Sequence, residues 1–201
     1  MANRADHDAH LRETTVVDEP VWRGTFLDIR RATVALPSGT HATREYIVHP
    51  GAVMVVPILD DGRLVMERQF RYPMQRVMLE FPAGKIDPGE APITTAVREL
   101  AEETGYRARE WARAGLLNNA IAYSDEGIEI WFARGLTRGA VRLDAEEFLE
   151  TVVHTEAEID ALCARGEITD AKTLIGLLWL QKSRSGAWPL VWQPAPGGPQ
   201  P

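Results

Sequence analysis

Residues 84–106, which read GKIDPGEAPITTAVRELAEETGY, constrain the fold of this chain more than any other segment. The segment opens with a loop in which glycine, aspartate and proline residues mark tight turns. Pro92 then stands where the first turn of a helix tolerates a missing N–H group, and Gly105 provides a common helix end. The sequence therefore predicts a turn-rich loop followed by a helix of about 12–14 residues.

The predicted helix has two unlike faces. Apolar or small positions recur at the spacing of a core-facing stripe, at Ile93, Val97, Leu100 and Thr104. Glu99, Glu102 and Glu103 lie on the other side at offsets of three and four, so their carboxylates are neighbours. The one guanidinium within reach, Arg98, does not balance three carboxylates, whereas a hard divalent cation such as Mg²⁺ does. The competing interpretation is a solvated acidic face, which is what most charge runs are.

Loop and helix together follow the pattern G-x5-E-x7-R-E-U-x-E-E-x-G-U, in which U is bulky and apolar or aromatic. Its fixed positions are filled by Gly84, Glu90, Arg98, Glu99, Leu100, Glu102, Glu103, Gly105 and Tyr106. This pattern resembles the Nudix box. The resemblance implies hydrolysis of a nucleoside diphosphate linked to another moiety, with Mg²⁺ or Mn²⁺ held on this helix.

Composition limits the class of protein. A chain of 201 residues suits one domain with a real core, and its net charge of −7 argues against nucleic acid or anionic membrane as a partner. The single cysteine, Cys163, permits no internal disulfide, which fits a reducing cytosol. The N-terminus lacks the apolar run of a signal peptide, and no window reaches the roughly 18 apolar residues of a membrane span. We therefore expect a cytoplasmic protein.

The chain divides into four expected segments. These are a flexible tail (residues 1–15), an N-terminal β extension (16–50), the Nudix hydrolase domain (51–184) and a tail rich in proline and glycine (185–201). The extension reads as a hairpin around a turn at residues 37–40, and a hairpin is marginal unless it packs on something else. In the proteins that this chain resembles, the extension packs across a dimer, so we expect a homodimer.

Strand and helix patterns alternate through residues 51–184. The expected strands cover residues 52–59, which read as buried on both faces, then 63–69, 78–81, a strand ending near 117, 128–133 and 147–154. A capping box from Thr155 to Glu158 opens one helix that stops near Gly166, and Thr169 or Asp170 caps a second helix that runs to about Ser183. Helices on both sides of a mixed sheet predict an α/β/α sandwich, here the Nudix sandwich.

Segments outside the box resemble the ADP-ribose pyrophosphatase branch of the Nudix family. They are residues 67–72 (ERQFRY), 80–84 (EFPAG), 44–45 (RE) ahead of 49–52 (HPGA), and 170–173 (DAKT). This resemblance implies ADP-ribose as the substrate, with AMP and ribose 5-phosphate as products.

Metal ligands follow from the same resemblance. The carbonyl of Ala83 and the carboxylates of Glu99 and Glu103 would bind the cation, and Glu102 would bridge or complete the set. Arg98 would orient the carboxylates, a role that suits its fixed fork of donors. Glu126, on the loop after the box, would act as the general base, with Asp125 and Glu129 as substitutes. The alternative role for Glu126 is to cap a turn.

Substrate contacts are implied as well. Arg71 and Arg68 would face the diphosphate, although Arg68 also reads as an ordinary surface residue. Gly84, at the start of the box, belongs to the same expected substrate site. Arg44 and Glu45 would lie near the adenine, and Trp22 would stack on the base unless it packs in the core or a dimer contact.

The loop at residues 118–123 (NNAIAY) departs from the family pattern. Many ADP-ribose hydrolases have a proline in this loop, and a glycine is common at the position of Ala122. Because loop residues select the substrate in this family, two alternatives stay open. One is a pyrophosphatase for GDP-mannose or another nucleotide sugar, and the other is a Nudix module that binds nucleotides without catalysis.

Overall fold

The computed structural model describes residues 7–143 and 148–196. These residues form two compact units, the first from residues 7–49 and 120–126 and the second from the remainder. Three parts of the expected organisation lie outside the described residues: positions 1–6 of the N-terminal tail, Glu147 at the start of the expected strand 147–154, and positions 197–201 of the C-terminal tail.

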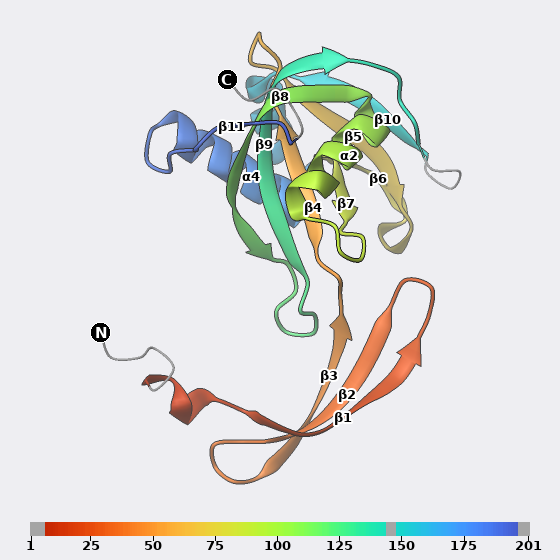
Figure 1. The fold of residues 1–201 in the computed structure, drawn as a ribbon, viewed down its shortest axis with the longest axis vertical. Helices are drawn as coiled ribbons and strands as arrows, with labels where there is room; N and C mark the ends of the chain where they lie inside the picture. Colours follow the sequence, from red (N-terminus) through yellow and green to blue (C-terminus); the bar gives the residue numbers. More distant parts are fainter. Residues whose placement is uncertain (1–6, 144–147, 197–201) are drawn as a thin grey trace. The chain divides into compact units, whose positions relative to one another are not determined.

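The first unit is an antiparallel sheet in the order β1-β2-β3, labelled in Figure 1. Its elements are the short 3₁₀ helix η1 (Ala9–Leu11) and the strands β1 (Thr14–Arg23), β2 (Asp28–Ala35) and β3 (His41–Val48). The turn between β2 and β3 closes through a hydrogen bond from the N–H of Leu36 to the carbonyl of Thr40 at 2.8 Å, as the hairpin prediction requires. The sequence did not reveal how early the sheet begins, because β1 starts at Thr14, inside the segment expected to be a tail.

The strands described in the second unit form two sheets. The larger has the order β11-β8-β9-β4-β7, and the smaller has the order β10-β5-β6. The strands are β4 (Ala52–Pro57), β5 (Leu64–Arg71), β6 (Arg76–Glu80), β7 (Ala83–Lys85), β8 (Tyr106–Asn118), β9 (Gly127–Arg138), β10 (Leu149–His154) and β11 (Gln193–Pro194). A short 3₁₀ helix, η2 (Tyr72–Met74), joins β5 to β6. Strands β4 and β9 are parallel and the other pairs are antiparallel, so the expected mixed sheet is confirmed.

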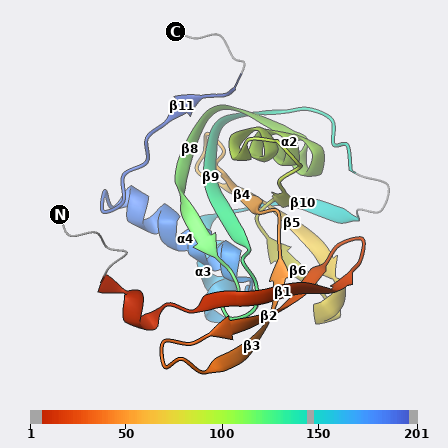
Figure 2. The ribbon, with the colours of Figure 1, turned by 60° about the horizontal axis from the view of Figure 1, so that its bottom comes forward.

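Helices cover both faces of the larger sheet. Helix α2 (Pro92–Thr104) lies on one side of β8, β9 and β4, and helix α4 (Ala171–Arg184) lies on the other, as Figure 2 shows. Helix α3 (Glu156–Ala164) belongs to the α4 side, because its Ile159 packs in the same buried cluster as Leu177 of α4. The expected α/β/α sandwich is therefore confirmed.

Strand β4 explains why the sandwich has two cores. Every residue of β4 is buried, as expected of a strand covered on both faces. Its side chains alternate, so Val53 and Val55 join the cluster that contains Leu100 of α2, whereas Met54 and Val56 join the cluster that contains α3 and α4. This central position fixes β7, which pairs with β4, against α2.

Both helix starts predicted from capping residues agree with the structure. At α3, Thr155 accepts a hydrogen bond from the N–H of Glu158 at 3.2 Å, and the Glu158 carboxylate accepts one from the N–H of Thr155 at 2.7 Å. At α4 the cap is Asp170, which accepts from the N–H of Thr173 at 2.9 Å. No helix in the described ranges is long and apolar enough to cross a membrane.

The C-terminal segment is more ordered than its composition indicated. Its strand β11 pairs with β8, where Gln193 lies opposite Trp111. Trp188 packs on Trp179 of α4 with ring centroids 4.5 Å apart, and the guanidinium of Arg134 lies 4.0 Å from the Trp192 ring centre. The expectation of a tail without regular structure was wrong only at Gln193–Pro194, where the chain forms β11; Trp188 and Trp192 lie outside regular structure.

Candidate active site

Helix α2 has the ends and length that the sequence predicted. Pro92 opens it, and Gly105 ends it in the left-handed conformation at φ 72°. The burial of its acidic residues decides between the two interpretations of this helix. Glu99 and Glu103 are only 8% and 3% exposed, so these two carboxylates are buried beside Leu100. Burial of this kind does not fit a solvated acidic face.

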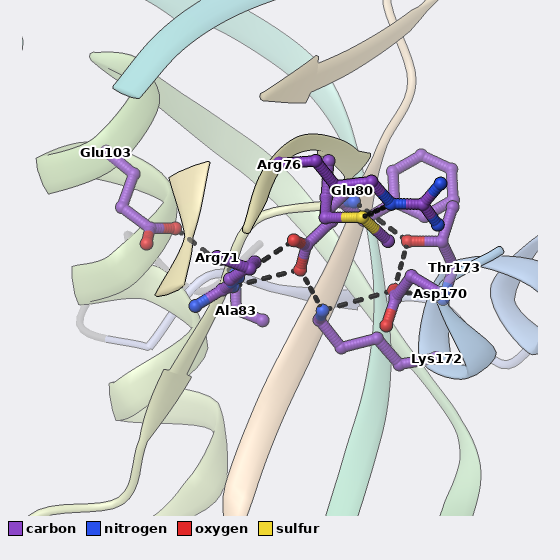
Figure 3. Close-up of polar contacts among 10 residues, drawn as sticks. Arg71, Arg76, Glu80, Ala83, Glu103, Asp170, Lys172 and Thr173 are labelled. Atoms are coloured by element: carbon purple, nitrogen blue, oxygen red, sulfur yellow. Dashed lines mark hydrogen bonds and ion pairs between the residues drawn. The ribbon is translucent and has the colours of Figure 1, made fainter. Parts of the chain in front are cut away.

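The loop before α2 approaches these carboxylates closely. The N–H of Ala83 donates a hydrogen bond to Glu103 Oε2 at 3.2 Å, as Figure 3 shows. A Cβ atom at Gly84 would lie 1.9 Å from Glu99 Oε1, which is far inside van der Waals contact. Position 84 therefore has to be glycine for β7 to lie this close to the Glu99 carboxylate.

Arg98 connects the remaining acids of the box. Its guanidinium donates to Glu90 at 3.0 Å, to Glu99 at 2.8 Å and to Glu102 at 3.1 Å. The hydrogen bond with Glu90 is the main reason that the pKa of Arg98 is raised, and the same bond lowers the pKa of Glu90. One positive charge thus holds three carboxylates in place, which is the orienting role expected for Arg98.

A second ionic cluster lies on the smaller sheet and the start of α4. Glu80 of β6 is buried and accepts two hydrogen bonds from Arg71, at 2.8 and 2.9 Å, and one from Lys172. Burial by itself would raise the pKa of Glu80, but these cations outweigh it and the pKa is lowered. Figure 3 shows Glu103 on one side of Ala83, and Glu80 with Lys172 and Asp170 on the other.

Glu67 of β5 is a buried acid that we did not identify as a site residue from the sequence. It is fully buried, and neither of its carboxyl oxygens has a hydrogen-bond partner among the described residues. Burial raises the pKa of Glu67 to about 7, with a further contribution from the negative charge of Glu80. The sequence signal for Glu67 was a carboxylate that directly follows the three apolar residues at the start of β5.

Arg68 and Arg71 lie on opposite faces of β5 because side chains alternate along a strand. Arg71 faces the buried acids, and 38% of its side chain is exposed. Arg68 pairs with Glu150 at 2.7 Å on the other face, where it lines a groove of about 400 Å³ with Phe70 and Phe148. The geometry thus separates two residues that we expected at one diphosphate.

The other expected residues for substrate binding belong to the first unit. Trp22 is 53% exposed, and its ring lies over Gly24. Arg44 donates to Glu13 at 3.0 Å, and Glu45 accepts from Arg31 at 2.8 Å. All of these side chains are carried by the three-stranded sheet or the segment next to β1.

The loop that follows β8 also belongs to the first unit. Its Asp125 accepts a hydrogen bond from the N–H of His49 at 2.8 Å, which fixes the loop against the end of β3. Glu126 Oε1 lies 3.6 Å from His49 Nε2, and only 21% of its side chain is exposed. Glu129, one of the substitutes for the base, pairs instead with Arg113 at 2.9 Å in the second unit.

The donor set of the box suits a hard divalent cation. Glu99, Glu102, Glu103 and the Ala83 carbonyl offer only oxygen ligands, which hard divalent cations prefer. Within residues 7–143 and 148–196, no three acidic, histidine or cysteine side chains form a metal cage on their own.

Comparison with known proteins identifies the class. Residues 48–177 match the NUDIX domain, which is more than half of the chain, so this protein belongs to the Nudix family. Its fold agrees with a solved crystal structure of an ADP compounds hydrolase, with a TM-score of 0.79 and 27% identity over 88% of this chain and 96% of that one.

Two curated relatives match most of this chain. The chain is 36% identical to the ADP-ribose pyrophosphatase of Bacillus subtilis (strain 168) over 173 residues, which cover 85% of this chain and 94% of that protein. It is 35% identical, with the same coverage, to the methanol dehydrogenase activator of Bacillus methanolicus. The resemblance inferred from the box is therefore confirmed at the level of the family.

Proposed function

We propose that this chain is a metal-dependent Nudix hydrolase that cleaves the diphosphate bond of ADP-ribose to give AMP and ribose 5-phosphate. The observation that carries the proposal is the buried pair Glu99 and Glu103 on the box helix, held by Arg98 and by the N–H of Ala83. The similarity to a pyrophosphatase named for ADP-ribose supports this choice of substrate.

Ala83, Glu99, Glu102 and Glu103 would hold the cation, which we propose to be Mg²⁺, with Mn²⁺ as a substitute. The bound ion activates the attacking water and neutralises charge on the phosphates. Arg98 keeps Glu99 and Glu102 oriented toward the metal, since it donates to both carboxylates. Gly84 contributes by leaving room for Glu99, and it completes the proposed substrate site.

Arg71 would bind the diphosphate. Its Nε and Nη2 atoms are committed to Glu80, which fixes the plane of the guanidinium while part of the side chain stays exposed. A fixed, charged fork of this kind suits phosphate oxygens. Arg68 would give longer-range attraction only, because it lies on the opposite face of β5 and pairs with Glu150.

Trp22, Arg44 and Glu45 would recognise the adenine end of the substrate, with Trp22 stacking on the base. Glu126 would accept the proton of the attacking water as general base. The contact between Glu126 and His49 supports this role, because it restrains the position of the carboxylate. The hydroxyl of Ser124 accepts a hydrogen bond from the N–H of Glu126 at 3.1 Å, which holds the backbone of the loop.

We further propose that the protein is a cytoplasmic homodimer that acts on small molecules and binds neither nucleic acid nor membrane. The net charge of −7 supports the last point. Strand β1 supports the dimer, because all of its residues are exposed, including Val16, Val17 and Val21. A long edge strand with several exposed apolar side chains is typical of a surface that pairs with another chain.

Turnover on a substrate panel tests the function. The protein would be assayed with Mg²⁺ on ADP-ribose, GDP-mannose, ADP-glucose, NADH and a diadenosine polyphosphate, with alkaline phosphatase to release phosphate from the products. We expect ADP-ribose to have the highest kcat/KM. A different preferred substrate would keep the chemistry and overturn the specificity, which the departure at residues 118–123 makes worth testing.

Glu103→Gln is the variant that tests the proposed metal site in the same assay. It keeps the size of the side chain and removes one metal ligand, so we expect turnover to fall by about 100-fold or more with the fold intact. Retention of most activity would remove Glu103 from the metal site. If the unmodified protein were inactive on every substrate with metal present, the Nudix binding module would become the better proposal.

A further inference from the structure

The loop between β8 and β9 is fastened to the end of β3 by backbone hydrogen bonds within the first unit. The N–H of Ile47 donates to the carbonyl of Tyr123 at 2.9 Å, and the N–H of Asp125 donates to the carbonyl of Ile47 at 3.3 Å. Ile47 and Ser124 form a parallel bridge between the same two segments. The loop therefore lies along β3, although 76 positions separate Asp125 from His49, the residue that follows this strand.

His49 contacts both acids of this loop. Its backbone N–H donates a hydrogen bond to Asp125 Oδ1 at 2.8 Å, and its ring atom Nε2 lies 3.6 Å from Glu126 Oε1. Asp125 thus fixes the backbone of His49, whereas Glu126 lies beside the imidazole. The two adjacent acids have different surroundings, and only Glu126 is placed to receive a hydrogen bond from the ring.

The imidazole of His49 lies in a sheltered position. Only 8% of its side chain is exposed, and the ring of Phe26 meets it edge-on, with centroids 6.5 Å apart and planes at 64°. The side chain of Glu126 is more open, at 21% exposed. A fixed ring beside a carboxylate that solvent reaches suits a pair in which one group orients the other, and the second accepts a proton.

The chemistry of imidazole fits the orienting role. The partner of each ring nitrogen decides which of the two carries the proton, and a carboxylate beside Nε2 favours the proton at that atom. The ring then donates to Glu126 Oε1 and leaves Oε2 to accept a proton. The separation of 3.6 Å exceeds the roughly 2.7–3.2 Å of an N–H···O hydrogen bond, and contacts of catalytic groups are often this long before the substrate binds.

We propose that His49 is a positioning residue that acts through Glu126, since its Nε2–H holds one oxygen of the carboxylate and leaves the other to accept the proton. This inference rests on the proposed function, in which Glu126 is the general base. It gives the N-terminal extension a part in the chemistry, because β3 and the residue that follows it hold the loop that carries the base.

Steady-state kinetics of the full-length protein test the inference, with Mg²⁺ and the panel substrate that has the highest kcat/KM. His49→Phe keeps a ring and removes both nitrogen atoms, so we expect kcat to fall by about 10-fold or more while KM changes less than about twofold. His49→Gln places an amide N–H near the position of Nε2 and should recover part of the loss. His154→Phe is the matched control, because it removes the imidazole of a comparable pair with Glu158, at 3.8 Å, and should leave kcat unchanged.

A double-mutant cycle separates a role through Glu126 from a role in packing. In Glu126→Gln the proposed base is gone, so the addition of His49→Phe should change kcat by less than about twofold. Equal factors for His49→Phe in both backgrounds would overturn the inference, because His49 would then act independently of Glu126.

The imidazole itself gives a readout that needs neither metal nor turnover. Long-range ¹H–¹⁵N spectra of the metal-free protein, at about pH 9 where free imidazole is neutral, show which ring nitrogen carries the proton. His49→Gln identifies the signals of His49 by their loss. We expect the proton on Nε2, with a changed shift of that nitrogen in Glu126→Gln. A proton on Nδ1 alone, or signals that Glu126→Gln leaves unaltered, would overturn the inference even if His49→Phe did not fold.

The outcomes distinguish this inference from the proposed function. If the unmodified protein were active and His49→Phe kept its kcat, the role of His49 would be overturned and the hydrolase proposal would stand. If Glu126→Gln kept full activity, the base and the residue that positions it would both be wrong, again without loss of the hydrolase. If the unmodified protein were inactive on every substrate of the panel, the proposed function would fail and the role of His49 with it.

Discussion

Gly84 shows how a single residue controls the candidate site. Its missing side chain allows β7 to pass within contact of Glu99, and the same loop brings the N–H of Ala83 to Glu103. The sequence pattern requires glycine here, and the structure supplies the physical reason. At this scale the box is a set of close contacts between neighbouring segments, so its residues are sensitive to very small changes in volume.

Gly84→Ala should therefore impair catalysis more than folding. The new Cβ atom, placed 1.9 Å from Glu99 Oε1, would push away the end of a flexible side chain. We expect kcat/KM to fall by about 100-fold, as a displacement of roughly 1 Å at a reacting centre can do, at a cost of about 1–3 kcal/mol in the free energy of unfolding. Full activity in a steady-state assay would show that Glu99 does not need its present position.

Glu126→Gln tests the general base at the same scale. Loss of the proton acceptor should lower kcat by about 100-fold or more while KM changes little. Glu129→Gln is the comparison, because Glu129 pairs with Arg113 and should leave kcat close to that of the unmodified protein. If Glu126→Gln raised KM more than it lowered kcat, the loop would bind substrate and not accept a proton.

Among the elements, α4 is tied to the site through its first turn. Asp170 caps the helix and also accepts from Lys172 Nζ at 3.1 Å, and Thr173 Oγ1 accepts a hydrogen bond from the N–H of Phe81 at 3.2 Å. This arrangement links the start of α4 to the segment between β6 and β7 that carries Ala83. The sequence offered Thr169 and Asp170 as equivalent caps, and only the structure distinguishes them.

Asp170→Ala should destabilise the protein by about 2 kcal/mol, because it removes the cap and a partner of Lys172. Thr169→Ala should cost less than about 1 kcal/mol, since Thr169 contacts the side chain of Arg76 and does not cap the helix. Urea unfolding of both variants at neutral pH measures the difference. Equal losses would mean that the two residues share the cap in solution.

The pairing of Glu80 with Arg71 and Lys172 predicts a dependence of stability on pH. The pKa of Glu80 is lowered from 4.5 in the folded protein, so the unfolded chain binds the proton more readily. Its contribution to the free energy of unfolding is therefore present above about pH 4.5 and is lost as the pH falls further. Glu80→Gln should be less stable by about 3 kcal/mol at neutral pH.

Chemical unfolding in EDTA at several pH values measures this effect. The difference between the unmodified protein and Glu80→Gln should shrink as the pH falls below about 4.5, because protonated Glu80 no longer pairs with either cation. A difference that stays constant across the acidic range would show that the ion pairs with Arg71 and Lys172 contribute nothing that depends on ionisation.

For the whole molecule, the proposed homodimer predicts the mass of the protein in solution. Sedimentation equilibrium should give about twice the chain mass of 22.4 kDa. Val17→Glu places a charge on the exposed strand β1 and should shift the protein toward the monomer without unfolding it. Cys163→Ser, on α3 in the second unit, is a comparison that should leave the mass unchanged. A monomer at every concentration would contradict the dimer.

The sequence alone determined the box helix, its two ends, the capping of α3 and the buried strand β4. Each of these depends on residues that are close together in the chain, so spacing and local hydrogen bonding are enough to specify them. The family followed from the same short-range pattern. The assignment of Glu99, Glu103 and Arg98 to one site was possible for this reason.

Only the tertiary structure decided which acids are buried and what they meet. Glu67 read as an ordinary member of a matching segment until the register of β5 against β6 and β10 placed it beside Glu103. The strand in the C-terminal segment likewise depends on its pairing with β8, which is distant in sequence. Long-range strand pairing and packing set these contacts, and no local pattern encodes them.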